Sequence, residues 1–274
     1  MPCTRLAPSP TGALHLGNIR TFLVNWALAR QRSWKIVLRI DDLDGPRIKP
    51  GAAAEAIELL TWLGLDWDDG PRFQTHDLEP YFVALDRLGR KGAIYPCRCT
   101  RKQIEAASLS APHEGTVEIR YPGTCRPASP VPATYESSQR PSDPGDDNPP
   151  AWRLRVDNRT TGFLDAFAGP QQDNVHQSIG DFLVAAKNGL PSYQLAVVVD
   201  DAGEGIDRLV RGDDLLASTH RQLHLYEHLQ LGPPPEFTHL PRVGGSDGRR
   251  LAKRHGDPRV HAYRQRGVSA ARVV

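Results

Sequence analysis

The sequence predicts an α/β fold built on a parallel sheet. Short apolar strands alternate with amphipathic helical segments in the first part of the chain, and the strand expected over 35–40 is largely apolar without alternation. Strands of this kind are typical of parallel sheets, which helices cover on both faces. The β-α-β-α order then calls for right-handed crossovers between neighbouring strands.

Turn residues and residues that end helices predict the boundaries of the strands and helices in the first part of the chain. A Pro/Gly turn over 8–12 separates the first strand from the first helix. Gly64 and Gly92 end the next two helices, because glycine readily takes the left-handed conformation that closes a helix. The expected elements are strands over 3–7 and 35–40 and helices over 15–32, 52–63 and 81–90.

The pattern changes over residues 95–188, where strands become short and turns frequent. Within it, 126–150 is rich in Pro, Ser and Asp and lacks apolar periodicity, which predicts an exposed or disordered loop. We expect a Rossmann-type core in two halves, 1–94 and 189–274, interrupted by an inserted α+β subdomain over 95–188. Further expected elements are a strand over 152–156, α/β segments at 194–199 and 209–210, a helix over 215–231 and one C-terminal helix.

Composition favours a globular protein over a membrane protein. Hydrophobic residues make up 39% of the 274 residues, enough for a sizeable core, and no apolar run approaches the length of a membrane-spanning helix. The N-terminus lacks a basic segment followed by an apolar core, so we expect a cytoplasmic protein. A net charge of +2 neither requires nor excludes a nucleic-acid partner.

The turn and helix start over 8–18 form a candidate phosphate site. Backbone N–H groups at a helix N-terminus lack partners within the helix, and the helix dipole favours an anion there. Gly17 has no Cβ, so a flat ring could approach the backbone, and His15 could bond a phosphate oxygen during nucleotidyl transfer. The alternative is a turn into a helix with an exposed histidine.

Two motifs resemble the signatures of one enzyme family. Residues 8–18, Pro-Ser-Pro-Thr-Gly-Ala-Leu-His-Leu-Gly-Asn, resemble the first signature of the class I aminoacyl-tRNA synthetases, and the preceding Arg5 and Ala7, with Ser9, are typical of the glutamyl branch. Residues 247–256, Asp-Gly-Arg-Arg-Leu-Ala-Lys-Arg-His-Gly, resemble that branch's second signature. Two signatures in the family's order make chance agreement a poor explanation.

The resemblance implies a pocket for glutamate. Arg5 and Arg211 would bind its carboxylates, because a guanidinium makes bidentate bonds to a carboxylate. Asp41 would hold the ammonium group where the family has glutamate, so the shorter side chain leaves open a neighbouring substrate such as aspartate. On spacing alone, each arginine could instead be a solvated surface group. The expected set is Arg5, Ala7, Ser9, Asp41, Tyr193 and Arg211.

The same resemblance implies ATP bound together with Mg²⁺. Lys253 and His15 would stabilise charge developing on the phosphates, and Arg250 stands where the second signature has its first lysine. Ala252 replaces a serine, and losing one hydrogen bond costs about 0.5–1.5 kcal/mol, so we expect a slower enzyme rather than an inactive one. The expected ATP-binding residues are Thr11, His15, Gly17, Asn18, Arg250 and Lys253.

Three of the four cysteines lie in the inserted segment. In a cytoplasmic chain, Cys97, Cys99 and Cys125 favour metal binding over disulfides. The family's short paralogue has the same Cys-x-Cys, Tyr-xxx-Cys pattern, which implies one structural Zn²⁺ with Tyr121 or a water as fourth ligand. His113 is a further candidate ligand, and inert buried cysteines are the alternative.

The segment after the second signature bears on function. Residues 256–274 leave room for one helix, whereas glutamyl-tRNA synthetases carry a large anticodon-binding domain there. The resemblance is therefore to the truncated paralogue, expected to be a monomer, which activates glutamate with ATP without tRNA and esterifies queuosine at the wobble position of tRNA(Asp). The alternatives are a truncated glutamyl-tRNA synthetase charging the tRNA 3′ end, a small-molecule nucleotidyltransferase and a non-catalytic tRNA-binding protein.

Arginines within and after the second signature are candidates for holding the anticodon stem-loop of tRNA(Asp). Guanidinium groups bind backbone phosphates and so position a nucleic acid. Solvated helix and loop charge is the alternative. The residues are Arg249, Arg250, Arg254, Arg259, Arg264 and Arg266.

Overall fold

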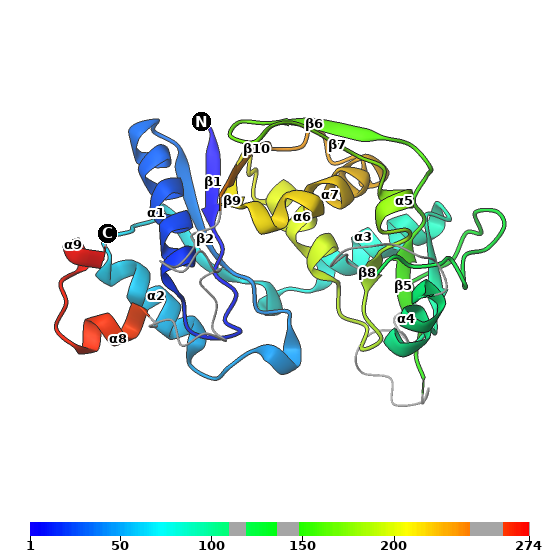
Figure 1. Ribbon diagram of the computed structural model, residues 1–274, viewed down its shortest axis with the longest axis horizontal. Helices are drawn as coiled ribbons and strands as arrows, with labels where there is room; N and C mark the ends of the chain where they lie inside the picture. Colours follow the sequence, from blue (N-terminus) through cyan, green and yellow to red (C-terminus); the bar gives the residue numbers. More distant parts are fainter. Residues whose placement is uncertain (110–118, 136–147, 242–259, 274) are drawn as a thin grey trace.

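The computed structural model describes residues 1–109, 119–135, 148–241 and 260–273 (Figure 1). The strands in these ranges form three sheets, and parallel pairing joins most strands of the first two. The predicted α/β fold with a parallel sheet is therefore confirmed.

The first sheet holds the strands expected near the N-terminus. Strand β1 (Cys3–Leu6) pairs in parallel with β2 (Lys35–Ile40), which pairs in parallel with β3 (Asp69–Phe73). Helices α1 (Leu16–Gln31) and α2 (Ala52–Trp62) make the connections, and both were predicted to within a residue of each end. The agreement arises because the apolar pattern and the flanking turns are strong here.

Aliphatic side chains from these strands and helices form one core. Leu6, Ile36 and Leu38 of the sheet and Leu59 and Leu60 of α2 are fully buried together. Burying a side chain of this size stabilises a fold by about 1.5–3 kcal/mol. This packing holds β1 and β2 in place against α2, and so fixes where the two strands end.

The second sheet has the strand order β7-β6-β10-β9. It meets the first sheet beside β1, where the Asp207 N–H donates to the Cys3 carbonyl at 3.1 Å and the Cys3 N–H donates to Asp207 Oδ1 at 2.7 Å. Helices α6 and α7 lie next to this sheet (Figure 1). The elements are β6 (Thr161–Asp165), β7 (Gly169–Asp173), α6 (Tyr193–Gly203), β9 (Arg208–Gly212), α7 (Leu216–Leu229) and β10 (Glu236–Leu240).

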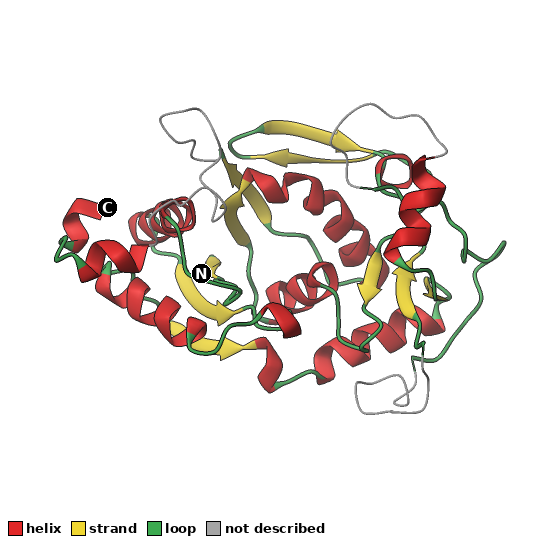
Figure 2. Cartoon of the chain, turned by 60° about the horizontal axis from the view of Figure 1, so that its bottom comes forward, coloured by secondary structure: helices red, strands yellow, loops and turns green. Residues whose placement is uncertain are grey.

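The third sheet is antiparallel and has the order β4-β5-β8. Figure 2 shows it at the end of the molecule away from the C-terminus. The β6–β7 hairpin also falls within 95–188 but belongs to the second sheet, so this segment contributes to both. The remaining elements are α3 (Glu79–Arg90), β4 (Ile94–Cys97), α4 (Arg101–Leu109), β5 (Ala151–Leu154), α5 (Val175–Ser178) and β8 (Leu183–Ala185), with 3₁₀ turns at Gly45–Arg47, Gln74–His76 and Asp213–Leu215.

The prediction of an exposed loop over 126–150 is wrong for part of its described residues. Tyr135 is 5% exposed, its ring centroid lies 5.5 Å from that of Trp152, and its hydroxyl donates to the Gly189 carbonyl at 2.9 Å. One aromatic anchor thus holds a segment that has no apolar periodicity. Residues 136–147 of this prediction lie outside the described ranges.

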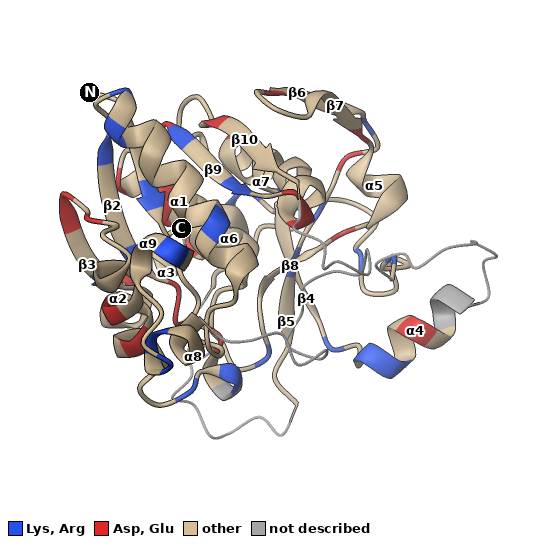
Figure 3. Cartoon of the chain, turned by 60° about the vertical axis from the view of Figure 1, so that its left-hand side comes forward, with Lys and Arg blue, Asp and Glu red and all other residues tan. Residues whose placement is uncertain are grey.

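The C-terminal segment contains two short helices where one was predicted. Helices α8 (Val260–Gln265) and α9 (Ala270–Val273) are separated by Gly267. Its φ is +73°, a left-handed conformation that glycine adopts readily and that ends α8. The Arg264 guanidinium of α8 lies 3.5 Å from the Glu58 carboxylate of α2. Figure 3 shows α8 near α2, with basic positions coloured blue on the ribbon of α8 and acidic positions red on that of α2.

None of the helices in the described ranges is long and apolar enough to cross a lipid bilayer.

Gly89→Ala should destabilise the fold by about 1–3 kcal/mol, the usual cost of overpacking. A Cβ at this position in α3 would lie 2.3 Å from the Ala133 carbonyl oxygen. Gly203→Ala, near the end of α6, is the matched control, because its Cβ would meet no atom within 4 Å. The control should be neutral or gain up to about 1 kcal/mol from helix propensity. Urea unfolding measures both, and equal midpoints would contradict the close packing at Gly89.

Candidate functional site

A cavity of about 300 Å³ opens where strands β1, β2, β9 and β10 end. Ligands of doubly wound folds bind at this edge, outside the carboxyl ends of the strands. The cavity brings together nine of the residues predicted from the sequence: Arg5, Ala7, Ser9, His15, Gly17, Asn18, Asp41, Tyr193 and Arg211.

Three predicted ATP-binding residues are not among those lining the cavity. Thr11 is described but does not line it. Arg250 and Lys253 lie outside the described residues, as do the other residues of the second motif.

His15 caps the first helical turn at one side of the cavity. Its Nδ1 accepts the Asn18 N–H at 3.3 Å, and Asn18 Oδ1 accepts the His15 N–H at 3.2 Å. With Nδ1 as acceptor, the neutral ring carries its proton on Nε2. A Cβ on Gly17 would come within 3.0 Å of the imidazole, so glycine permits this ring position. The arrangement supplies a ring donor beside a helix N-terminus, which suits an anion.

Arg5 is held from behind by a buried acid. Its Nε donates to Asp201 Oδ1 at 3.1 Å, and Arg39 donates to the same oxygen at 2.9 Å. Burial alone raises the pKa of Asp201, but the charges of Arg5 and Arg39 outweigh burial and hold that pKa below its usual value. Asp201 is therefore ionised and fixes the Arg5 guanidinium at the cavity.

Asp41 lines the cavity but already has a cationic partner. Arg39 Nε donates to Asp41 Oδ1 at 2.8 Å, and both side chains are buried. The sequence analysis missed Arg39 as a site residue. Its position two residues before Asp41 was a usable signal, because alternate residues of a strand share one face.

Arg211 projects from β9 and is 3% exposed. Its Nε donates to His239 Nε2 at 2.9 Å, and one terminal nitrogen donates to Thr219 Oγ1 and Gln222 Oε1 at 2.7 and 2.8 Å. The other terminal nitrogen, NH1, is buried and has no hydrogen-bond partner in the described part of the chain. A buried cationic nitrogen without a partner suits a carboxylate ligand, to which it can donate a charge-assisted hydrogen bond. Sequence reasoning missed His239, which no motif marks.

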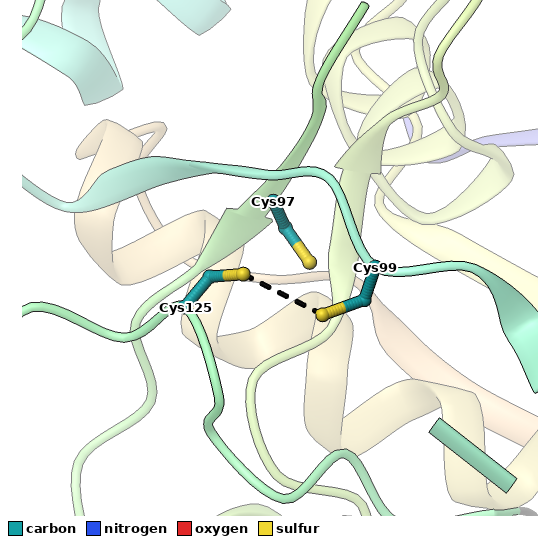
Figure 4. Close-up of side chains that lie close together, drawn as sticks. All are labelled: Cys97, Cys99 and Cys125. Carbon is teal, nitrogen blue, oxygen red and sulfur yellow. Dashed lines mark hydrogen bonds between the residues drawn. The ribbon is translucent and has the colours of Figure 1, made fainter. Parts of the chain in front are cut away.

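The three cysteines predicted to bind a metal do cluster. The sulfur atoms of Cys97, Cys99 and Cys125 all lie within 4.8 Å of one another, with Cys99 and Cys125 at 3.5 Å (Figure 4). The Tyr121 hydroxyl lies 3.5 Å from Cys97 Sγ and accepts the Cys125 N–H at 2.8 Å. The described residues thus offer three sulfur ligands and a neighbouring oxygen, a set that fits a metal ion. His113 lies outside the described ranges.

A buried arginine supports the cysteine cluster. Arg153 Nε lies 3.4 Å from Cys97 Sγ, and its guanidinium stacks 3.8 Å from the Tyr121 ring centre. Burial opposes ionisation of Cys97, but hydrogen bonds from Tyr121 and Arg153 lower its pKa to about 7. A thiol poised in this way can deprotonate and serve as a ligand near neutral pH.

Comparison with known proteins agrees with this geometry. Residues 3–273 match the family model described as tRNA synthetases class I (E and Q), catalytic domain. A Rhodopirellula baltica protein named glutamyl-Q tRNA(Asp) synthetase is 46% identical over 98% of this chain and 82% of its own length. A Symbiobacterium thermophilum protein of the same name is 44% identical over 100% of this chain and 84% of its own.

A solved structure has a similar fold. The glutamate tRNA ligase from Elizabethkingia meningosepticum, solved in complex with its amino acid, superposes with a TM-score of 0.76 at 25% identity. The match covers 93% of this chain and 52% of the ligase, so the chain spans about half of that enzyme's length.

Purified protein should carry about one thiophilic metal ion per chain, because three thiolates within bonding reach of one ion bind such metals tightly. Cys125→Ser should lower the metal content well below one equivalent. Cys3→Ser is the control, since Cys3 is buried in β1 and is not among the three clustered cysteines, and it should retain the metal. Elemental analysis under reducing conditions measures this, and wild-type protein with little metal would contradict the assignment.

Proposed function

Because this chain belongs to the class I (E and Q) tRNA synthetase family, we propose that its cavity activates glutamate with ATP. We further propose that the glutamyl group then passes to queuosine in tRNA(Asp), the activity named in relatives that match nearly the whole chain. The observation that carries the proposal is a single cavity lined by two anchored arginines and by the histidine-capped start of α1.

The two arginines suit a dicarboxylic amino acid. Arg5 and Arg211 line one cavity, and each is fixed by buried partners on its other side. Glutamate brings two carboxylates and one ammonium group, so the ammonium group pairs with Asp41 and the carboxylates with the arginines. Tyr193 lies at the same cavity and adds a hydroxyl. Ala7 and Ser9 complete this side as small residues that leave room for substrate.

The start of α1 suits the nucleotide. Backbone N–H groups at a helix N-terminus bind phosphate, and His15 adds a ring donor there. Gly17 leaves room for the imidazole of His15, and Asn18 holds that histidine in place. Thr11, Arg250 and Lys253 remain proposed ATP ligands by family resemblance. Mg²⁺ bound to ATP supplies further neutralisation of phosphate charge.

The proposed reaction has two displacement steps. A carboxylate oxygen of glutamate attacks the α-phosphorus of ATP, the bond to the β-phosphate oxygen breaks, and pyrophosphate leaves. A hydroxyl of the queuosine cyclopentenediol then attacks the acyl carbon of glutamyl adenylate, loses its proton and displaces AMP. His15 acts in the first step by donating to phosphate oxygens as negative charge develops.

The cysteine cluster is proposed to bind one structural zinc ion. Cys97, Cys99, Cys125 and the Tyr121 oxygen form the expected ligand set, consistent with a tetrahedral site. The cluster lies beside the antiparallel sheet rather than among the residues of the cavity. Its role is therefore to stabilise the 95–188 segment.

We also propose that basic residues near the C-terminus hold the anticodon stem-loop. Arg264 and Arg266 are exposed in and just after α8, whose ribbon carries blue basic positions in Figure 3. Contacts of this kind go to phosphates and give no sequence preference. Selectivity for the acceptor then comes from the modified base at the cavity.

Glutamate should support ATP–pyrophosphate exchange in the absence of tRNA. His15→Ala should lower the rate by at least ~10²-fold, the scale of losing one transition-state contact. His261→Ala in α8 is the matched control, because His261 is not among the residues lining the cavity. Strong exchange with another amino acid and none with glutamate would overturn the pocket assignment.

Glutamate should label tRNA(Asp) that carries queuosine and leave tRNA(Asp) with guanosine at the wobble position unlabelled. The bond should be an alkali-labile ester and should survive removal of the 3′-terminal adenosine from the tRNA. Label that disappears with the terminal adenosine would favour charging at the 3′ end. Protein that neither exchanges pyrophosphate nor labels any tRNA would contradict both transfer to queuosine and charging of the 3′ end.

A further inference from the structure

A buried chain of hydrogen bonds links Asp165 to the Arg211 guanidinium through His239. The Nδ1 atom of His239 lies 2.6 Å from Asp165 Oδ2, and Arg211 Nε donates to His239 Nε2 at 2.9 Å. None of the three residues is more than 3% exposed. Water does not reach these buried side chains to replace a misplaced donor, so the position of each hydrogen atom is set by the hydrogen-bond partner next to it.

Chemistry fixes the direction of this chain. A guanidinium only donates, so His239 Nε2 is the acceptor and the ring proton is on Nδ1, where Asp165 accepts it. Burial, followed by the charge of Arg211, lowers the pKa of His239 to about 4, so the ring is neutral at pH 7. Asp165 therefore sets the tautomer of His239, and the tautomer sets the orientation of Arg211.

Three neighbouring strands bring these residues together. His239 in β10 is in register with Arg211 in β9, so both side chains lie on one face of the sheet. Strand β6 pairs with β10 through Asp165 and Phe237, which places the carboxylate beside the imidazole. The β6–β7 hairpin of the 95–188 segment is thus linked through His239 to Arg211, a residue of the cavity.

Only one terminal nitrogen of Arg211 is left for a ligand. Thr219 and Gln222 hold one terminal nitrogen, whereas NH1 is buried without a partner in the described ranges, and the residue lines the cavity. We propose that Asp165 and His239 are positioning residues that set the affinity for glutamate by aiming Arg211 NH1 at a substrate carboxylate. This inference rests on the proposed function and deepens it.

Asp165→Asn tests the tautomer directly. Asp165 Oδ1 accepts the N–H groups of Phe167 and Ala168 at 3.0 and 2.8 Å, so the amide oxygen takes that place and the NH₂ group faces His239 Nδ1. His239 must then move its proton to Nε2, where it meets the Arg211 Nε–H. We expect the KM for glutamate in pyrophosphate exchange to rise about tenfold or more, with the KM for ATP nearly unchanged.

A double-mutant cycle separates positioning from general damage to the fold. His239→Gln supplies an amide oxygen as acceptor for Arg211 and has no tautomer to switch, so its KM for glutamate should stay well below that of His239→Leu. In the His239→Gln background, Asp165→Asn should raise the KM for glutamate by a much smaller factor than it does in the wild-type background. His224→Gln is the matched control, because His224 is a buried histidine of α7 without a hydrogen bond in the described residues.

Urea midpoints and the nitrogen chemical shifts of the histidine rings complete the experiment. Wild-type protein should show His239 protonated on Nδ1, and Asp165→Asn should show it protonated on Nε2. A wild-type Nε2–H form, an unchanged KM for glutamate in Asp165→Asn, or equal losses of glutamate and ATP affinity would each overturn the inference. Wild-type protein without glutamate-dependent exchange would overturn the proposed function as well, which the first three outcomes leave intact.

Discussion

The cavity depends on one fully buried charge, the guanidinium of Arg39. Its nitrogen atoms donate to Asp41, Asp201 and Glu204 at 2.8–2.9 Å, and the residue is 1% exposed. Leaving a buried charge without its partners costs several kcal/mol, so β2 and α6 stay docked with these carboxylates in place. Asp201 shares one oxygen between Arg39 and Arg5. Arg5, which lines the cavity, is thus positioned through Asp201 by Arg39, which does not line it.

The same principle operates on the other side of the cavity. Arg211 is held by neutral acceptors, His239, Thr219 and Gln222, and a buried acid stands one residue further back at Asp165. Two guanidinium groups beside one small cavity repel each other, and fixed acceptors behind them keep both in place. Donors that are already oriented lower the entropic cost of binding an anionic ligand.

The segment over 95–188 has two structural roles that its local sequence does not separate. Its cysteine cluster is supported by Arg153, which contacts both Cys97 and the Tyr121 ring at the antiparallel sheet. Its β6–β7 hairpin instead pairs with β10 of the second sheet, which places Asp165 against His239, behind the cavity residue Arg211. The cysteine cluster and the support of Arg211 therefore belong to one stretch of chain but rest on different strands.

The sequence by itself determined the longer helices, the two N-terminal strands and the chemistry-bearing motifs, whereas strands such as β3, β6, β7 and β8 were not predicted. Continuous apolar strands, glycine stops and the Pro/Gly turn before His15 are local signals, and nine of the predicted residues line one cavity because strand ends of a parallel sheet meet at one edge. Only the tertiary structure decided which buried residues support those that line the cavity. Arg39, Asp201, His239 and Asp165 act through pairings between distant segments, which leave no local pattern. The buried position of Tyr135 was missed for the same reason, since packing overrides weak local preference. The end of α8 at Gly267 is instead a local glycine stop, which the prediction of a single C-terminal helix did not use.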